Sequence, residues 1–371
     1  MRKIIFVLVV ACILSLMVWT TTFTGCCSLP WIDCDKTPTP VPTKTPTPEP
    51  TVTPTPTPWV PKTVLTVKDR SFYINGKKTF LIGFSYYGGL GASVDQMKID
   101  INYMKNKGFN WFRLWSMWNR CLQNASIVDL HGEWVPDVYS KFVAMMNFCD
   151  KNGIIIDVTG HFCNKNFSNC CNAQDRTCDG PFSDCAKPSE PCRTIADLKK
   201  FWQNMAKLCK PWRNLYFDIA NEHDVQDARH VNSKDVQKIR NAIKAIDPDR
   251  LVTCSGAQTY QANAEHLDFM APHLARGHEP WKKTCPWLQL HGPKFNDGPV
   301  QLQEPFRNGY GSDMYEWWEF CEDLKRAINC SFPAAGWCFH NDAAYDLKNN
   351  KFIDELDPEE KKFIRRLSEC M

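Results

Sequence analysis

One feature constrains the fold of this chain more than any other: from residue 72 onward, short apolar runs alternate with longer segments of helical periodicity. Continuous apolar runs of this length are typical of strands buried on both faces of a parallel sheet. We expect strands at residues 80–87, 110–117, 154–159, 214–222, 251–255, 269–273, 299–304 and 334–339. We expect helices at residues 94–107, 138–151, 195–208, 233–246, 314–328 and 358–367. Strands alternating with helices in this number predict an α/β fold, a (β/α)8 TIM barrel, over residues 62–371.

Two additions to the barrel are predicted. Residues 72–80 carry Asn75-Gly76 between apolar stretches, the strongest short-range signal for a β-hairpin. We expect this N-terminal hairpin to close the floor of the barrel. A Cys-rich insertion after the third strand, residues 161–193, is expected to form a disulfide-braced wall of the cleft at the other end.

Residues 1–25 predict an export signal that is not part of the fold. Met1-Arg-Lys3 precedes an apolar run that extends to Trp19, the pattern of a secretory signal peptide. The sequence Phe23-Thr-Gly-Cys26 resembles a bacterial lipoprotein cleavage site, which would place a lipid on Cys26. Two alternatives stay open: cleavage without lipid, and retention of residues 4–23 as a membrane anchor. All three predict an extracytoplasmic protein, either secreted or tethered to a membrane through its N-terminus.

Residues 26–61 predict a Thr/Pro-rich linker. From residue 36 the segment repeats Thr-Pro, and proline fixes φ and removes backbone donors, so the chain stays extended. Such a segment cannot bury a core and acts as a semi-rigid spacer. The leader and spacer together indicate a module held away from a surface.

The chain has 19 cysteines, of which one, Cys12, lies in the leader. In an exported chain this density favours disulfides, and the Cys-x-x-Cys spacing typical of structural zinc sites does not occur in the sequence. We therefore expect disulfides of undetermined pairing, no metal and no organic cofactor.

Two glutamates, Glu222 and Glu304, end predicted strands four and seven. In a (β/α)8 barrel the C-terminal strand ends form the active-site face, and these two strands face each other across the barrel mouth. A pair of carboxylates across a cleft, about 5–5.5 Å apart, is the machinery of retaining glycoside hydrolysis. One serves as acid/base and the other as nucleophile. The alternative is that both are ordinary ion-pair partners.

Other residues at strand ends are candidates for substrate contacts. The Asn221 amide could bind a sugar hydroxyl, and Arg113 could hold a carboxylate ionised and oriented. His161 and His273, at the ends of strands three and six, could donate hydrogen bonds. Aromatic rings could stack against a sugar, and the candidates are Trp337, Trp115 and Tyr86, with Trp118 and Tyr87 as further possibilities. Each also has a structural alternative, an ion pair for Arg113 and core packing for the rings.

These motifs carry a family resemblance. Residues 72–342 resemble the clan of (β/α)8 retaining glycoside hydrolases, most nearly family 5, the cellulase and mannanase group. The resemblance rests on residues 217–222 and 301–304 and on Arg113, His161, His273 and Trp337. It implies that Glu222 is the acid/base, Glu304 the nucleophile, Asn221 a ligand of the 2-hydroxyl and Arg113 a support for the nucleophile. Two positions depart from the family pattern: His223 replaces a frequent proline, and Ala275 replaces a frequent tyrosine beside the nucleophile.

The sequence thus predicts an exported retaining glycoside hydrolase acting on a β-linked polysaccharide or oligosaccharide of β-glucan or β-mannan type. A net charge of +3 with no basic stripe argues against a nucleic-acid partner. We expect a monomer that meets the membrane only through its N-terminus. Two alternatives are a non-catalytic carbohydrate-binding or adhesion module on a barrel scaffold and a cell-surface transglycosylase.

Overall fold

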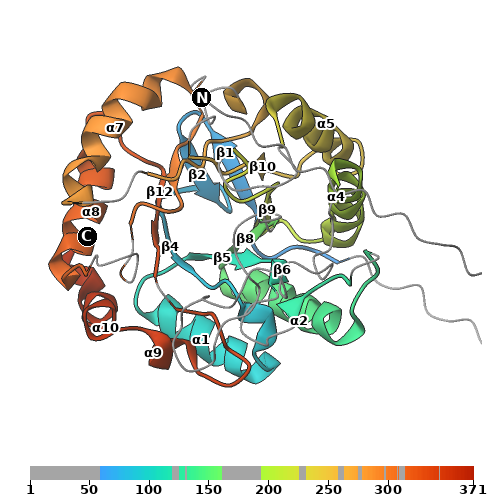
Figure 1. Ribbon diagram of the computed structural model, residues 1–371, viewed down its shortest axis with the longest axis horizontal. Helices are drawn as coiled ribbons and strands as arrows, with labels where there is room; N and C mark the ends of the chain where they lie inside the picture. The colour runs from blue at the N-terminus through green and yellow to red at the C-terminus, as the bar shows by residue number, and fades with distance from the viewer. Residues whose placement is uncertain are drawn as a thin grey trace, which may run out of the picture. The chain divides into compact units, whose positions relative to one another are not determined.

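Seven parallel strands curl into a single sheet at the centre of the computed structural model (Figure 1). Their order is β10 (Val252–Thr253), β9 (Leu215–Asp218), β8 (Ile155–Thr159), β5 (Trp111–Trp115), β4 (Leu81–Ser85), β12 (Gly336–Phe339) and β11 (Gln301–Leu302). The sixth strand of the ring joins β10 to β11 through three parallel bridges: Gly256 to Pro272, Met270 to Val300 and His273 to Glu304. The predicted (β/α)8 barrel is therefore confirmed, with a sixth strand held by single bridges.

The structure describes residues 59–118, 125–129, 132–160, 194–224, 231–257, 263–274, 278–295, 298–306, 308, 314–341 and 343–371. All of them belong to one compact unit, Thr57–Met371. The leader, nearly all of the linker and the Cys-rich segment 161–193 lie outside the described residues. The predictions made for those segments stay predictions.

Helices surround the sheet on its outer face (Figure 1). They are α1 (Val94–Asn106), α2 (Pro136–Asn152), α4 (Ile195–Cys209), α5 (Ser233–Lys244), α7 (Thr284–His291), α8 (Trp317–Asn329), α9 (Phe352–Glu355) and α10 (Pro358–Arg366). Short 3-10 helices lie at Gly89–Gly91, Ala264–His266, Pro280–Lys282, Gly292–Lys294 and Leu367–Glu369. A two-stranded ribbon, β6 (Met117–Trp118) with β7 (Ala125–Ser126), follows β5. This ribbon, α7 and α9 are additional to the predicted elements.

Helix starts are set by side-chain caps. Capping boxes, in which the N-cap and the residue three positions later bond each other's backbone N–H, begin α4, α5 and α10. These helices begin at the predicted residues, because Thr194, Asn232 and Asp357 are strong N-cap residue types. Among the described helices, none is both apolar enough and long enough to cross a membrane.

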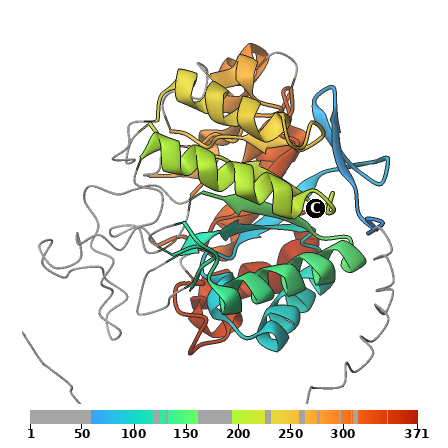
Figure 2. The ribbon, with the colours of Figure 1, turned by 90° about the vertical axis from the view of Figure 1, so that its right-hand side faces the viewer.

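A small antiparallel sheet covers one end of the barrel, at the right of the side view (Figure 2). It consists of β1 (Leu65–Lys68), β2 (Ser71–Ile74) and β3 (Lys77–Thr79), so the predicted hairpin is present with one extra strand. Phe72 of β2 is fully buried and meets the Phe269 ring edge-on at 5.0 Å. At the end of the barrel that this small sheet covers, the interior is thus filled by apolar side chains.

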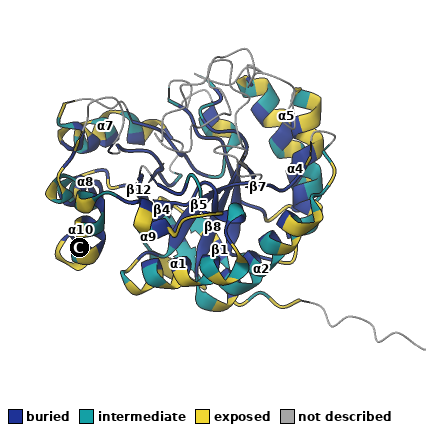
Figure 3. Cartoon of the chain, turned by 60° about the horizontal axis from the view of Figure 1, so that its bottom comes forward, coloured by how far each residue is buried: buried dark blue, intermediate teal, exposed yellow. Residues whose placement is uncertain are grey.

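Gly83 leaves space for one of these apolar side chains, the indole of Trp111. A Cβ at residue 83 would lie 2.1 Å from the indole of Trp111, which is fully buried inside the barrel. Any side chain on β4 at this position would displace the indole, so the bulk of Trp111 requires glycine on the neighbouring strand. Burial follows the same plan through the molecule, with dark buried residues on the strands and exposed residues on the outer faces of the helices (Figure 3).

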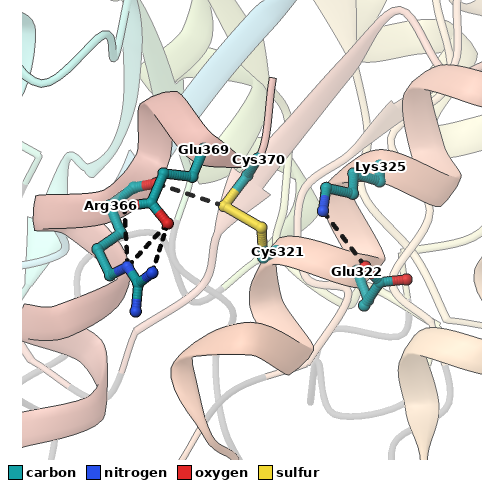
Figure 4. Close-up of a disulfide and its surroundings, with 6 residues drawn as sticks. All are labelled: Cys321, Glu322, Lys325, Arg366, Glu369 and Cys370. Atoms are coloured by element: carbon teal, nitrogen blue, oxygen red, sulfur yellow. Dashed lines mark hydrogen bonds and ion pairs between the residues drawn. A yellow bond between two sulfur atoms is a disulfide. The ribbon is translucent and has the colours of Figure 1, made fainter.

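Disulfides tie the C-terminal third together. Cys285 of α7 bonds Cys330, which follows α8. Figure 4 shows the other disulfide, between Cys321 of α8 and Cys370 next to the C-terminus. Both are disulfides of the kind that the cysteine-rich sequence predicts. The described residues also include buried cysteines outside these bonds: Cys149, Cys209, Cys254 and Cys338.

Candidate active site

Arg113 forms the centre of the candidate site. It lies on β5 and is fully buried. Its guanidinium donates to Glu304 Oε1, to Asn221 Oδ1 at 2.5 Å and to Asp218 Oδ2 at 3.2 Å. Arg113, Asn221 and Glu304 are all predicted site residues, and the structure brings them into direct contact.

A buried carboxyl group lies beneath this centre. Asp157 Oδ2 is 3.6 Å from Arg113 Nε and accepts a hydrogen bond of 2.6 Å from Gln303. Burial raises the pKa of Asp157 well above its usual range, and the charge of Asp218 raises it further. Burial alone would lower the pKa of Arg113, but the carboxylates of Glu304, Asp218 and Asp157 outweigh that effect and raise it. The guanidinium therefore stays charged, and it forms its shorter ion pairs with Glu304 and Asp218.

Glu222 and Glu304 meet at His273. His273 Nδ1 lies 3.1 Å from Glu222 Oε1 and 3.5 Å from Glu304 Oε2. One atom from each of the three side chains lies within 4.8 Å of the others. When both groups are ionised carboxylates their oxygens can only accept, so in that state Nδ1 carries the hydrogen. The two predicted carboxylates thus share one cleft, with a predicted histidine between them.

The backbone that carries Glu222 is irregular. β9 ends at Asp218, and Glu222 has a φ of 43°. For a residue with a side chain this left-handed conformation costs about 1–2 kcal/mol. Regular alternation would send Asn221 and Glu222 to opposite faces of the sheet. Here the Asn221 amide reaches Arg113 while Glu222 reaches His273, so both serve the same cleft.

The next residue, His223, connects this turn to two other segments through hydrogen bonds. Its Nδ1 bonds the carbonyl oxygen of Val231 at 2.7 Å, and its Nε2 lies 2.9 Å from Asn263 Nδ2. The first contact requires Nδ1 to carry a hydrogen, because a carbonyl oxygen can only accept. The position at which the sequence departs from the family pattern therefore joins the turn to the start of α5 and to the segment after β10.

The seventh strand also breaks its alternation at the site. β11 ends at Leu302, and Gln303 donates inward to Asp157. The next residue, Glu304, also faces the interior and contacts Arg113. An unbroken strand would turn Glu304 outward, towards the helices. The irregular strand end is what delivers its carboxylate to the cleft.

A second histidine, not predicted from the sequence, also contacts Glu304. His340 follows β12, and its Nε2 lies 3.4 Å from Glu304 Oε2. Its Nδ1 lies 2.6 Å from Tyr87 Oη and 3.2 Å from Ser85 Oγ. The sequence could have indicated His340 through strand alternation, because residues two positions apart, Gly336, Cys338 and His340, share the inward face of the eighth strand.

Two predicted residues, Tyr86 and Trp337, lie outside the cleft, which corrects their interpretation as sugar-stacking residues. Tyr86 donates to Asp100 of α1 at 2.8 Å, and Trp337 donates to Asp323 of α8 at 2.6 Å. Both rings are fully buried between the sheet and the helices. The reason is strand alternation: each is one residue out of phase with the inward face of its strand. The residue after Tyr86, Tyr87, has the inward phase and contacts His340 and Trp115.

Trp115 does lie in the site. Arg113 Cζ is 5.8 Å from the centre of its ring, and the Tyr87 ring meets it edge-on at 5.2 Å. A second aromatic contact extends the group, since Tyr345 stacks on Tyr87 at 5.6 Å. His161 lies outside the described residues, so its predicted role stays a prediction.

Glu222, His273 and Glu304 are spaced closely enough for a cation to bridge them. The Arg113 guanidinium already occupies Glu304 Oε1, and His273 donates to the carboxylates in place of a metal. The three side chains are also suited to acid–base and nucleophilic chemistry, in which one carboxylate can attack an electrophile while the other transfers a proton.

Residues 72–291 match the family described as cellulase (glycosyl hydrolase family 5), which is more than half of the chain. No curated protein matches the sequence.

Solved structures share the fold at low sequence identity. A family 5 glycoside hydrolase from Bacteroides vulgatus has a TM-score of 0.58 at 11% identity, covering 84% of this chain and 73% of that one. A β-mannanase from the blue mussel Mytilus edulis has a TM-score of 0.52 at 15% identity, covering 82% and 96%. A cellulase has a TM-score of 0.51 at 15% identity, covering 84% and 93%. A further Bacteroides vulgatus structure, with a TM-score of 0.61 at 12% identity, is longer: 83% of this chain matches 61% of its length.

Proposed function

The chain belongs to the cellulase family, glycosyl hydrolase family 5, and is a glycosidase, and from this premise we propose that it cleaves a β-linked glycan with retention of configuration. Glu304 is the nucleophile and Glu222 the acid/base in this proposal. The observation that carries it is their spacing, with an oxygen of each carboxylate within 4.8 Å of the other. Retaining glycosidases need about 5–5.5 Å, whereas inverting ones leave about 6.5–9.5 Å for a water molecule.

The contacts of the two glutamates support this division of roles. Arg113 places a buried positive charge on Glu304, which favours the ionised form that a nucleophile needs. Glu222 is the more accessible of the two, with 14% of its side chain exposed against 5% for Glu304. An acid/base gives its proton to the leaving group in the first step and takes one from a water molecule in the second, and the accessible glutamate suits that role.

The reaction proceeds in two displacements. In the first, Glu304 forms an ester bond to the anomeric carbon, the glycosidic bond breaks, and Glu222 gives its proton to the leaving oxygen. In the second, water attacks the same carbon, Glu222 takes the proton of the water, and the ester bond to Glu304 breaks. The chain returns to its starting state, and the product keeps the configuration of the substrate.

We propose β-mannan and β-glucan as the polymer classes to test first. Asn221 binds Arg113 through its oxygen, which leaves the amide N–H groups to donate to a sugar hydroxyl next to the reacting carbon. Trp115 and Tyr87 supply aromatic surface beside it. Residues 1–61 would export the enzyme and hold it on a membrane-proximal spacer, through a lipid on Cys26 or an N-terminal anchor.

The decisive experiment compares Glu304→Gln and Glu222→Gln on β-glucan, β-mannan and an aryl β-glycoside with an activated leaving group. Glu304→Gln should lower turnover of every substrate by more than about 10⁴-fold, because no ester can form. Glu222→Gln should lower polymer turnover by about 10²–10⁴-fold. It should spare the first step on the activated glycoside, visible as a burst of released phenol, since that leaving group needs no proton.

The matched control is Glu265→Gln, which removes a glutamate whose side chain is 71% exposed. It should keep wild-type turnover. Wild-type rates in both site variants would contradict the mechanism. The anomer formed first, read by NMR, should be β, and an α product would contradict retention. Oligosaccharides longer than the substrate would assign the chain to transglycosylation in place of hydrolysis.

A further inference from the structure

The two oxygens of Glu304 face different groups. Oε1 accepts from Arg113, whereas Oε2 lies 3.4 Å from His340 Nε2 and 3.5 Å from His273 Nδ1. Both His340 and Glu304 are buried, with side chains 3% and 5% exposed. Among the described residues, the ion pairs place His273 beside both glutamates and His340 beside Glu304.

The ring of His340 has a defined hydrogen-bond pattern. Nε2 faces a carboxylate oxygen, which can only accept, so Nε2 carries hydrogen. A neutral imidazole then has its lone pair on Nδ1, and the Tyr87 hydroxyl at 2.6 Å donates to it. Ser85 Oγ at 3.2 Å lies beside the same nitrogen. The hydroxyl fixes the tautomer, and the tautomer aims a donor at Glu304.

We propose that His340 and Tyr87 act as a positioning pair for the nucleophile, with Tyr87 setting the tautomer of His340 and His340 donating to Glu304 Oε2. The inference rests on the proposed function of Glu304. The 3.4 Å separation is longer than a formed N–H···O bond and is expected to shorten when substrate closes the site. The pair supplies an imidazole and a hydroxyl from strands eight and one, in a chain whose sequence has Ala275 where the family often has tyrosine.

Other titratable groups also face Glu304, and the test must separate them from the pair. Arg113 reaches it from β5, His273 from the sixth strand, Glu222 from beyond β9 and Cys338 from β12. The variants below leave all four in place. Any change in the pH dependence of the free enzyme then follows from the Tyr87 hydroxyl or the His340 ring.

The experiment measures kcat/KM against pH for the full chain, with a 4-nitrophenyl β-cellobioside or β-mannobioside as the probe. Removing a donor disfavours ionised Glu304, so the acid limb of the profile should move to higher pH. For His340→Leu we expect a shift of about one to two pH units and a loss of about 10–100-fold, the range for one hydrogen bond to a charged group. Tyr87→Phe should give a smaller shift in the same direction. His340→Gln, which places an amide nitrogen near the position of Nε2, should recover part of the loss.

The matched control is Tyr86→Phe, the same change one residue earlier on the outward face. It removes a hydroxyl bonded to Asp100, so it should lower the unfolding temperature and leave the acid limb in place. Tyr87→Phe keeps the ring that packs on Trp115 and Tyr345, so it tests the pair even where His340→Leu fails to fold. Wild-type profiles in Tyr87→Phe and in folded His340 variants, with Glu304→Gln inactive, would overturn the pair alone. An active Glu304→Gln would overturn the proposed function instead.

Discussion

The two ends of the barrel interior are built on the same strands and have opposite chemistry. At the N-terminal end, Trp111 of β5 and Ile155 of β8 pack with Phe72 of the small antiparallel sheet. Two residues further along the same strands, Arg113 and Asp157 are equally buried and carry ionisable groups. Apolar burial stabilises the first end, whereas buried charges are retained at the second at a cost in stability. The comparison distinguishes residues whose burial stabilises the fold from buried residues that the fold positions at the candidate site.

The largest effect on this comparison is expected from Arg113→Met. The change leaves Glu304 and Asp218 buried without their cation, so we expect a loss of about 3–5 kcal/mol in the free energy of unfolding. It should also lower kcat by more than about 10³-fold, since the nucleophile loses its charge support. Urea unfolding and initial rates on one preparation measure both.

Arg250→Met is the matched control for that prediction. Arg250 is also buried, but it bonds Asp247 and the carbonyl oxygens of Cys209, Trp212 and Leu215, away from the cleft. Its loss should destabilise the fold to a similar degree while the remaining folded enzyme keeps its kcat. A similar loss of kcat in both variants would mean that the two regions are not functionally distinct.

A smaller effect, confined to stability, is expected from Phe72→Ala at the apolar end. The ring is fully buried against Phe269, so its removal should lower the free energy of unfolding by about 3 kcal/mol. The midpoint of urea unfolding should fall, with kcat per folded molecule unchanged. A fall in kcat at a temperature where the variant is fully folded would show that the floor also shapes the site.

The smallest effect extends the comparison to the outer face of β12, where Trp337 donates to Asp323. Burial raises the pKa of Asp323 to about 6, against the hydrogen bonds from Thr284 and Trp337, which lower it. The folded state therefore binds this proton more tightly than the unfolded state does, and its contribution to stability is lost as the pH rises through about 6. Between pH 5 and pH 8 that loss is about 1.4 kcal/mol.

Asp323→Asn removes this titration. The stability of the variant relative to the wild type should rise by about 1.4 kcal/mol from pH 5 to pH 8, as measured by urea unfolding at the two values. The pH profile of kcat/KM should be the same in both proteins, because Asp323 lies between the barrel and α8. An unchanged stability difference across this range would place the pKa of Asp323 near its ordinary value.

Strand and helix order could be predicted from the sequence because periodicity and caps are local signals. The predicted starts of α4, α5 and α10 match the structure, where Thr194, Asn232 and Asp357 cap these helices. The sixth strand was predicted, but its reduction to single bridges was not, because pairing depends on the neighbouring strands. The ribbon β6–β7 and helices α7 and α9 lie in connections whose sequence carries no extended period.

The phase of each strand explains which of the predicted residues the structure brings into the cleft. On strands one and eight the inward set is Ser85, Tyr87, Cys338 and His340, so choosing Tyr86 and Trp337 by residue type selected the outward neighbours. Alternation would have corrected both choices. At Glu222 and Glu304 the opposite holds: alternation fails there, because the backbone is irregular, and residue type together with motif identified the pair.

The contact between Tyr87 and His340 spans 253 positions of the chain and crosses the seam where β4 meets β12. Contacts of such separation form late in folding, because the loop they close has to lose its conformational entropy first. A nascent chain that ends before β12 contains both glutamates but cannot support the nucleophile across this seam. Full activity would then require closure of the barrel, so the rate at which activity appears during refolding reports the rate of this last step.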